Sequence, residues 1–106
     1  MTDYFISRNG SPKVKKKALF PLGQVVATPV ALAALKLANQ QPAEFIQRHQ
    51  LGDWGNVPPE DAEENNLSVQ KGFRILSSYT LSTGVEIWII TEADRSATTI
   101  LLPEEY

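Results

Sequence analysis

The first half of the chain carries apolar residues at helical spacing, divided by turn-forming residues. Residues 29–40 are nearly apolar all round and follow Thr28, whose hydroxyl suits a helix N-cap, so they predict a largely buried helix. Residues 42–50 predict a second helix that stops at Gly52. Residues 58–72 predict a third helix, because acidic residues fill its first turns and glycine ends it.

The second half of the chain alternates between apolar and polar residues, as strands do. Residues 73–81 and 85–93 predict two strands of a hairpin with a three-residue loop. Residues 97–103 predict a third strand, and residues 22–28 predict a short strand before the helices. This order predicts an α+β fold: a short N-terminal strand, three helices and a three-stranded antiparallel meander, with the helices packed on one sheet face.

The hairpin loop also predicts which side chains share a face of the sheet. It places Tyr79 opposite Ile87 and Ser77 opposite Ile89, on a mostly apolar face that should meet the helices. A register slipped by one residue would mix the two faces, and the alternation disfavours it. The opposite, amphipathic face then carries Arg74, Leu76, Ser78, Thr80, Glu86, Trp88, Ile90 and Glu92.

Length and charge refine this picture without changing the fold class. The chain has 106 residues, which suits one domain, and we assign that domain to residues 18–106. Residues 1–17 hold four of the lysines and predict a flexible basic tail, or alternatively an electrostatic hook for phosphate or an acidic partner. The formal net charge is −2, so the bulk charge does not attract nucleic acid.

Several classes of protein are excluded or disfavoured by composition. The chain has no cysteine, which excludes a disulfide framework, a thiolate zinc site and a cysteine nucleophile. The uncharged stretch over residues 18–35 is interrupted by prolines and a glycine, which argues against a membrane span. The first residues do not resemble a signal peptide. We expect a cytoplasmic protein with no cofactor and no metal, because neither a phosphate loop nor a paired-histidine metal motif is present.

The stretch RHQLGDWG contains the first group of candidate chemical residues. His49 is the one histidine of the chain, and an imidazole titrates near neutral pH, so it is a candidate general acid or base with Asp53 as its orienting group. The alternative is a half-buried histidine at a helix end, beside an aspartate that caps the following turn. Trp54 is expected to pin the loop to the core, with base stacking as the alternative.

A second group lies around the turn TEADRS. Glu92 and Arg95 bracket this turn, and Arg74 shares the predicted sheet face of Glu92. The two guanidiniums are candidates to hold a phosphate, with Glu92 as a second acid–base group. The alternative is a charge-paired sheet edge that deters aggregation. Further candidate binding residues are Arg48, Trp54, Ser78, Trp88 and Thr98.

The motif blocks ALFPLGQVVATP, RHQLGDWG, GFRILSSY and WIITEADRSATTILLPEEY carry a family resemblance. Over about residues 18–106 the chain resembles a family of small proteins encoded on plasmids and integrative elements of proteobacteria, often labelled only plasmid-related. That label implies no reaction. The layout is also similar in outline to the barnase–colicin–RelE superfamily of ribonucleases, although such toxins are usually basic and this chain is acidic.

Three functional hypotheses arise from these residues. The first is a metal-independent, ribonuclease-like protein of a mobile element, which acts on RNA and requires His49, Arg74, Glu92 and Arg95 to converge in one cleft. The second is a non-catalytic protein-binding module, such as an inhibitor of a host defence system, which requires an exposed apolar patch near Trp54 or Trp88. The third is a structural or regulatory dimer built on an exposed sheet edge. The sequence leaves the oligomeric state open.

Overall fold

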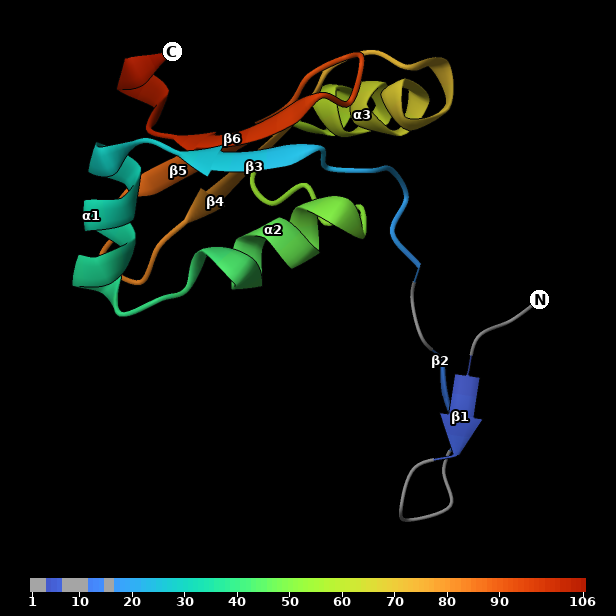
Figure 1. Cartoon of the computed structure of the whole chain (residues 1–106), viewed down its shortest axis with the longest axis horizontal. Coiled ribbons are helices and arrows are strands. Elements are labelled where there is room, and N and C mark those ends of the chain that lie inside the picture. The colour runs from blue at the N-terminus through green and yellow to red at the C-terminus, as the bar shows by residue number, and fades with distance from the viewer. Residues whose placement is uncertain (1–3, 7–11, 15–16) are drawn as a thin grey trace.

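The fold is an α+β arrangement of three helices and a mixed sheet, seen here in a computed structural model. The structure describes residues 4–6, 12–14 and 17–106. The tail predicted for residues 1–17 therefore lies mostly outside the described residues. The elements, in chain order, are β1 (Tyr4–Ile6), β2 (Pro12–Val14), β3 (Gln24–Ala27), α1 (Pro29–Ala38), α2 (Pro42–Gln50), α3 (Pro59–Lys71), β4 (Ile75–Thr80), β5 (Glu86–Thr91), β6 (Ala97–Leu101) and the short 3₁₀ turn η1 (Pro103–Glu105) (Figure 1).

The main sheet has four strands in the order β3-β6-β5-β4. Strands β4, β5 and β6 form an antiparallel meander, and β3 pairs with β6 in parallel. The α+β class is thus confirmed, and the predicted antiparallel meander is present as β4, β5 and β6. The prediction of a wholly antiparallel sheet is wrong, because β3 joins it as a fourth strand in parallel. The short N-terminal strand joins the sheet because Gln24 and Thr28 donate backbone hydrogen bonds to Ser96 and Ile100, at 3.0 Å each.

The predicted hairpin register is confirmed. Tyr79 pairs with Ile87 and Ser77 pairs with Ile89, and the Leu81 N–H donates to the Val85 carbonyl at 2.8 Å. Tyr79, Ile87 and Ile89 are buried in the core with residues of α1 and α2. The apolar face of the sheet therefore meets these two helices, as the alternation predicts.

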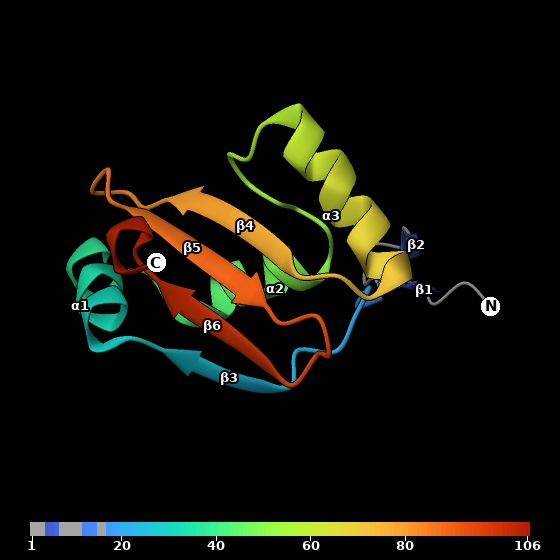
Figure 2. The same cartoon turned by 90° about the horizontal axis from the view of Figure 1, so that it is seen from above.

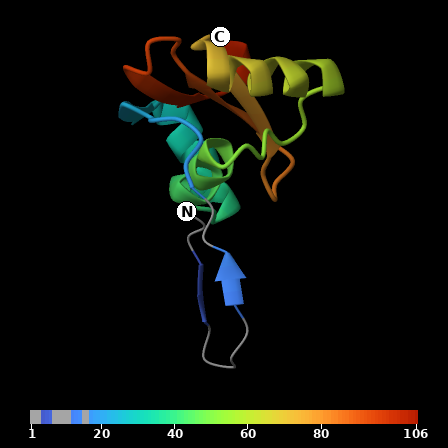
Figure 3. The ribbon, with the colours of Figure 1, turned by 90° about the vertical axis from the view of Figure 1, so that its right-hand side faces the viewer.

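The third helix departs from the predicted packing. In Figures 2 and 3, α1 and α2 lie on one side of the sheet, whereas α3 runs beside the outer edge of β4. The Asn65 side chain of α3 accepts a hydrogen bond from the Leu76 N–H and donates one to the Leu76 carbonyl, at 3.2 and 2.8 Å. The prediction of helices on one face holds for α1 and α2 and is wrong for α3, because this amide pairs with the edge of the strand.

The loop before α3 also covers the edge of β4. The Ser78 N–H donates to the Trp54 carbonyl at 3.0 Å, and the Asn56 N–H donates to the Ser78 carbonyl at 2.7 Å. Gly55 lies between these bonds in a parallel bridge with Ser78. The outward backbone groups of Leu76 and Ser78 are therefore satisfied, which protects this part of the edge from pairing with another chain.

The core consists of two clusters of buried side chains. The larger lies between α1, α2 and the sheet. The smaller groups Phe20, Trp54 and Ile75 under α3, with Val69 of that helix against it. Trp54 is 6% exposed, so the tryptophan after α2 is a core residue and joins the loop to the sheet.

Helix α1 is much less buried than its sequence predicts. Only one stripe of it, Ala31–Ala34–Leu35–Ala38, is buried. Leu37 is 82% exposed, Val30 51% and Leu32 46%. The prediction of a largely buried helix is therefore wrong, because α1 lies at one end of the sheet and touches the core along a single side (Figure 2).

Gly55 provides a direct test of the covered β4 edge. Its φ is +75°, and a Cβ at this position would overlap the Ser78 carbonyl oxygen. Gly84 is a matched control, because its φ is +91° but no atom lies within 4 Å of its Cβ position. We expect Gly84→Ala to cost about 1 kcal/mol and Gly55→Ala to cost more than about 3 kcal/mol. Urea unfolding measures both, and equal losses would contradict this account of the edge.

Candidate functional site

His49, the first candidate catalytic residue, is a core residue. It lies in the last turn of α2 and is 0% exposed. The rings of Phe20 and Trp54 meet it edge to face, with centroids at 5.2 and 5.9 Å. His49 therefore faces the helix side of the sheet, away from Arg74 and Glu92.

Both imidazole nitrogens of His49 have a buried partner. Nδ1 lies 2.6 Å from the Ser77 hydroxyl, and Nε2 lies 2.9 Å from the Thr91 hydroxyl. Thr91 continues the chain to the hydroxyl of Thr98 at 2.7 Å, and Thr98 donates to the Leu22 carbonyl at 2.8 Å. We call these linked groups the His49 chain.

The far end of the His49 chain determines the tautomer of the imidazole. A carbonyl only accepts, so Thr98 donates its one proton to Leu22 and must accept from Thr91. Thr91 then accepts from Nε2–H, which leaves Nδ1 to accept from Ser77. The neutral Nε2–H form satisfies every member, and burial lowers the pKa of His49 to about 4.

Arg48 and Asp53 form an ion pair at the turn after α2. Arg48 Nε donates to Asp53 Oδ2 at 2.7 Å, and the other carboxylate oxygen accepts from the Gly55 N–H at 3.2 Å. The same guanidinium lies over the Tyr79 ring at 4.6 Å, and the Asp53 carboxylate raises the pKa of Arg48. Asp53 therefore pairs with Arg48 and not with His49, contrary to the predicted orienting role, because His49 takes hydroxyl partners.

Arg95 caps the end of α3. It has a φ of +61°, and its guanidinium donates to the carbonyls of Ser68, Phe73 and Glu92 at 2.8, 2.7 and 3.1 Å. Ser68 lies in the last turn of α3, where its carbonyl also accepts from the Gly72 N–H at 2.9 Å, and Phe73 follows the C-cap residue Gly72. The Glu92 side chain is exposed. The Arg95 guanidinium is therefore hydrogen-bonded to backbone carbonyls.

Of the remaining candidates, Arg74, Ser78 and Trp88 lie on the open face of the sheet. Arg74 lies over the Tyr106 ring at 5.2 Å, and the rings of Tyr106 and Trp88 meet at 5.6 Å. Glu86 accepts hydrogen bonds from Ser78 and from Trp88 Nε1. This face brings Arg74, Ser78 and Trp88 into one neighbourhood, as predicted. Thr98 lies on the opposite side, inside the His49 chain.

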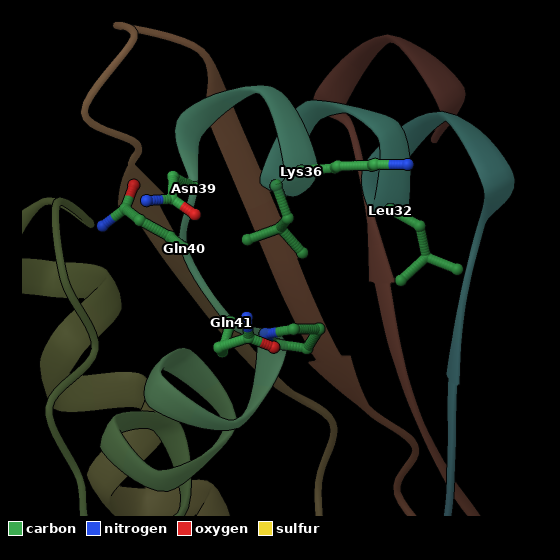
Figure 4. A pocket seen from close by; sticks show the side chains of 7 residues that line it. Leu32, Lys36, Asn39, Gln40 and Gln41 are labelled. Atoms are coloured by element: carbon green, nitrogen blue, oxygen red, sulfur yellow. The ribbon is translucent and has the colours of Figure 1, made fainter.

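His49 lines none of three surface hollows that the described residues form. One lies between α1 and the start of α2, beside Leu32, Lys36 and Gln41 (Figure 4). A second lies between α3 and the open sheet face, beside Asp61, Asn65, Arg74 and Leu76. The third, of about 340 Å³, lies between α1, the β4–β5 hairpin and the residues around η1. Its lining is mostly apolar side chains: Val30, Ala33, Ala34, Leu37, Thr83, Val85, Leu102 and Glu104.

The exposed side of α1 is a feature that the sequence pattern did not identify. We define the outer face of α1 as Val30, Leu32, Ala33, Lys36 and Leu37, all of which are exposed. The signal was present, because Val30, Ala33 and Leu37 recur at a spacing of three and four residues. This spacing predicts a buried helix equally well, because core helices and docking helices show the same apolar pattern.

The fold and the described side chains define an α+β protein with a buried histidine chain and an exposed apolar helix face. Comparison with family models, curated proteins and solved structures found no significant match. Within residues 4–6, 12–14 and 17–106, no group of three or more potential ligand side chains is placed to hold a metal ion. Over the same ranges, no helix is long and apolar enough to cross a membrane.

The His49 chain predicts a specific pH response. The pKa of His49 is about 4 in the folded state against 6.5 ordinarily, so between these values only the unfolded chain takes up the proton. The stability that neutral His49 contributes is complete above pH 6.5 and is lost as the pH falls toward 4, by about 3 kcal/mol in total.

Nuclear magnetic resonance measures this response directly, because the chain has a single histidine. We expect its imidazole signals to show the Nε2–H tautomer and to stay unchanged from pH 8 to about pH 5. A midpoint near the ordinary value of 6.5 in the folded protein, or the Nδ1–H tautomer, would contradict the assigned chain.

Proposed function

We propose that this chain is a non-catalytic protein-binding module that docks through the outer face of α1. The observation that carries the proposal is the 82% exposure of Leu37 beside the mostly apolar hollow. The surface differs in position from the predicted patches. Trp54 is buried, and Trp88 contacts Tyr106 and Glu86.

The outer face of α1 has the chemistry of a docking surface. Val30 and Leu37 of α1 and Val85 of the hairpin line the same hollow, and all three are exposed apolar side chains. An exposed contiguous apolar patch with a polar rim is typical of protein interaction sites. A partner helix that presents apolar residues every three or four positions suits such a face.

The catalytic alternative receives less support from the same geometry. His49 is buried on the helix side of the sheet, whereas Arg74 lies on the open face and Arg95 caps α3. A phosphate held by Arg74 would not reach His49, which has no exposed surface. We include in the proposal the role suggested by the family resemblance, that of an accessory protein of a mobile element.

Affinity capture with matched variants tests the binding proposal. Leu37→Asp removes the most exposed leucine of α1, and Leu67→Asp alters a leucine of α3 that is 47% exposed. Both surface changes should leave stability within about 0.5 kcal/mol. We expect a protein captured by the wild type and by Leu67→Asp to be lost with Leu37→Asp. A capture profile that is identical for all three proteins would contradict the proposal.

An RNA cleavage assay tests the catalytic alternative. We expect purified protein to leave RNA intact, because the candidate acid–base and phosphate-binding groups do not share a cleft. Arg74→Ala and Glu92→Gln are the variants to compare, since both side chains are exposed and can be changed without opening the core. Cleavage by the wild type that either variant abolishes would overturn the non-catalytic assignment.

A further inference from the structure

We propose that the outer edge of β3 binds strand β1 of a second copy of this chain, and that the two copies exchange this strand reciprocally. The edge of β3 is a different surface from the outer face of α1, so this dimer does not depend on the binding function proposed above. Three observations carry it: the open backbone edge of β3, the separate β1–β2 hairpin, and the opposite charges of the two segments.

The outer edge of β3 lacks the cover that protects the edge of β4. β3 is the last strand on its side of the sheet, and among the described residues no other strand pairs with that side. The N–H groups of Gln24 and Thr28 donate to β6. Because the bonding groups of a strand point alternately to its two sides, the N–H and C=O groups of Val25 and Ala27 point outward.

The residues of β3 favour pairing with another strand. Its sequence, QVVA, contains two exposed valines and neither a charged residue nor a proline. Natural edge strands usually avoid association by carrying a lysine, a proline or a bulge. β3 pairs with β6 in continuous register and has none of these devices. Since β-branched residues also favour strands, this edge is suited to the addition of a further strand.

The β1–β2 hairpin can supply that strand. Among the described residues, β1 and β2 pair only with each other, and Figures 1 and 3 show them away from the four-stranded sheet. A two-stranded hairpin is at best marginally stable in water, so a third strand would stabilise it. We assign the contact to β1, because Tyr4, Phe5 and Ile6 all favour strands, whereas β2 begins with Pro12, which has no N–H to donate.

The chain before β3 directs the hairpin away from β3 of its own copy. The Leu19 N–H donates to the carbonyl of Gln50, the last residue of α2, at 2.9 Å. The Gln50 side chain donates in turn to the Phe20 carbonyl at 2.9 Å, and Phe20 is buried beside Trp54. The hairpin therefore leaves the molecule beyond this end of α2 (Figure 1). A two-fold axis lets each copy present its hairpin to the open edge of the other.

The two segments carry opposite charges. Residues 1–17 contain five basic residues and one acidic residue, a net charge of +4, so the rest of the chain carries −6 of the total of −2. Carboxylates lie at both ends of β3. Asp94 lies two residues before the carbonyl that accepts from Gln24, and Glu105 accepts from the Thr28 hydroxyl at 2.7 Å. This complementarity favours the lysine-rich hairpin as the segment that covers the edge.

Amide hydrogen exchange of the full chain tests the pairing at the edge itself. We expect the outward N–H of Val25 to exchange about tenfold more slowly at about 1 mM protein than at about 10 μM, because dimer formation covers it. The Val26 N–H, which faces β6, is the internal control and should be protected at both concentrations. Val25 protection that is independent of concentration would indicate pairing within one copy, and no protection at either concentration would indicate an open edge. Either result would overturn the proposal.

Proline variants in sedimentation equilibrium identify the strand that is exchanged. Phe5→Pro interrupts β1 and leaves the four-stranded sheet unchanged, and Thr2→Pro is the matched control, since residue 2 precedes β1. We expect the wild type and Thr2→Pro to pass from monomer to dimer as the concentration rises to about 1 mM, and Phe5→Pro to remain monomeric. A wild type that stays monomeric, or a dimer that survives Phe5→Pro, would contradict the exchange of β1.

A proline in β3 tests the receiving edge. Val25→Pro removes an outward N–H and leaves the donors of Gln24 and Thr28 to bond β6, so we expect this variant also to remain monomeric. A dimer retained in Val25→Pro but lost in Phe5→Pro would show that β1 binds elsewhere, against the assignment to β3.

Leu37→Asp separates this dimer from the proposed function. Leu37 lies in the last turn of α1, whereas β3 leads into the first turn of that helix. We expect the monomer–dimer equilibrium of Leu37→Asp to match that of the wild type, even if the variant no longer captures a partner protein. Loss of the dimer in Leu37→Asp would place the contact on α1 and overturn the pairing at β3.

Discussion

The hydrogen-bonded chain of His49 is the constraint on which the rest of the structure depends. It runs from Ser77 of β4 through His49 of α2 to Thr91 of β5 and Thr98 of β6, and it ends on the carbonyl of Leu22. A buried polar group without a partner costs about 1–3 kcal/mol. Each group in the His49 chain therefore depends on its neighbour for a hydrogen-bond partner. Together they hold α2 against three strands and against the segment that leads into β3.

The position of α2 determines the path of the loop that leads from it toward α3. Leu51 and Gly52 end the helix, with Gly52 at a φ of +89°, and the N–H of Asp53 donates to the Arg48 carbonyl at 2.9 Å. The loop then brings Trp54 against His49 and pairs Gly55 with Ser78. One edge of the sheet is closed in this way, by the residues that the sequence marked as candidate chemistry.

The local features of this fold could be predicted from the sequence. The three-residue hairpin loop set the register of Tyr79 against Ile87, and the proline and glycine positions bounded all three helices within two residues. The pairing of β3 with β6 could not be predicted in the same way, because three helices and two strands lie between them in the chain. Nothing local to β3 distinguishes a strand that joins the sheet in parallel from one that does not.

The candidate site shows the same limit. Helical spacing places His49, four residues after Phe45, on the same side of α2, and both side chains are buried. Its depth, however, depends on hydroxyls that lie far along the chain, on β4 and β5. Arg95 was a reasonable phosphate ligand by residue type, but the carbonyls at the end of α3 lie within its reach. The sequence identifies side chains that could act as acids, bases or ligands. It does not show which of them are already hydrogen-bonded to other parts of the fold.

Among the described residues, the outer face of α1 is a surface that the fold leaves exposed, and it is the region we propose as functional. His49, Asp53 and Arg95 are bound to internal partners, and the edge of β4 is covered by Asn65 and the loop around Gly55. α1 has no comparable cover, since the small sheet contacts only one of its two apolar stripes. Leu37 and Val30 are exposed to water in the single chain. Burial of their apolar area would lower the free energy, so their exposure does not stabilise the fold. A protein partner of the kind we propose would recover that free energy by covering Val30 and Leu37.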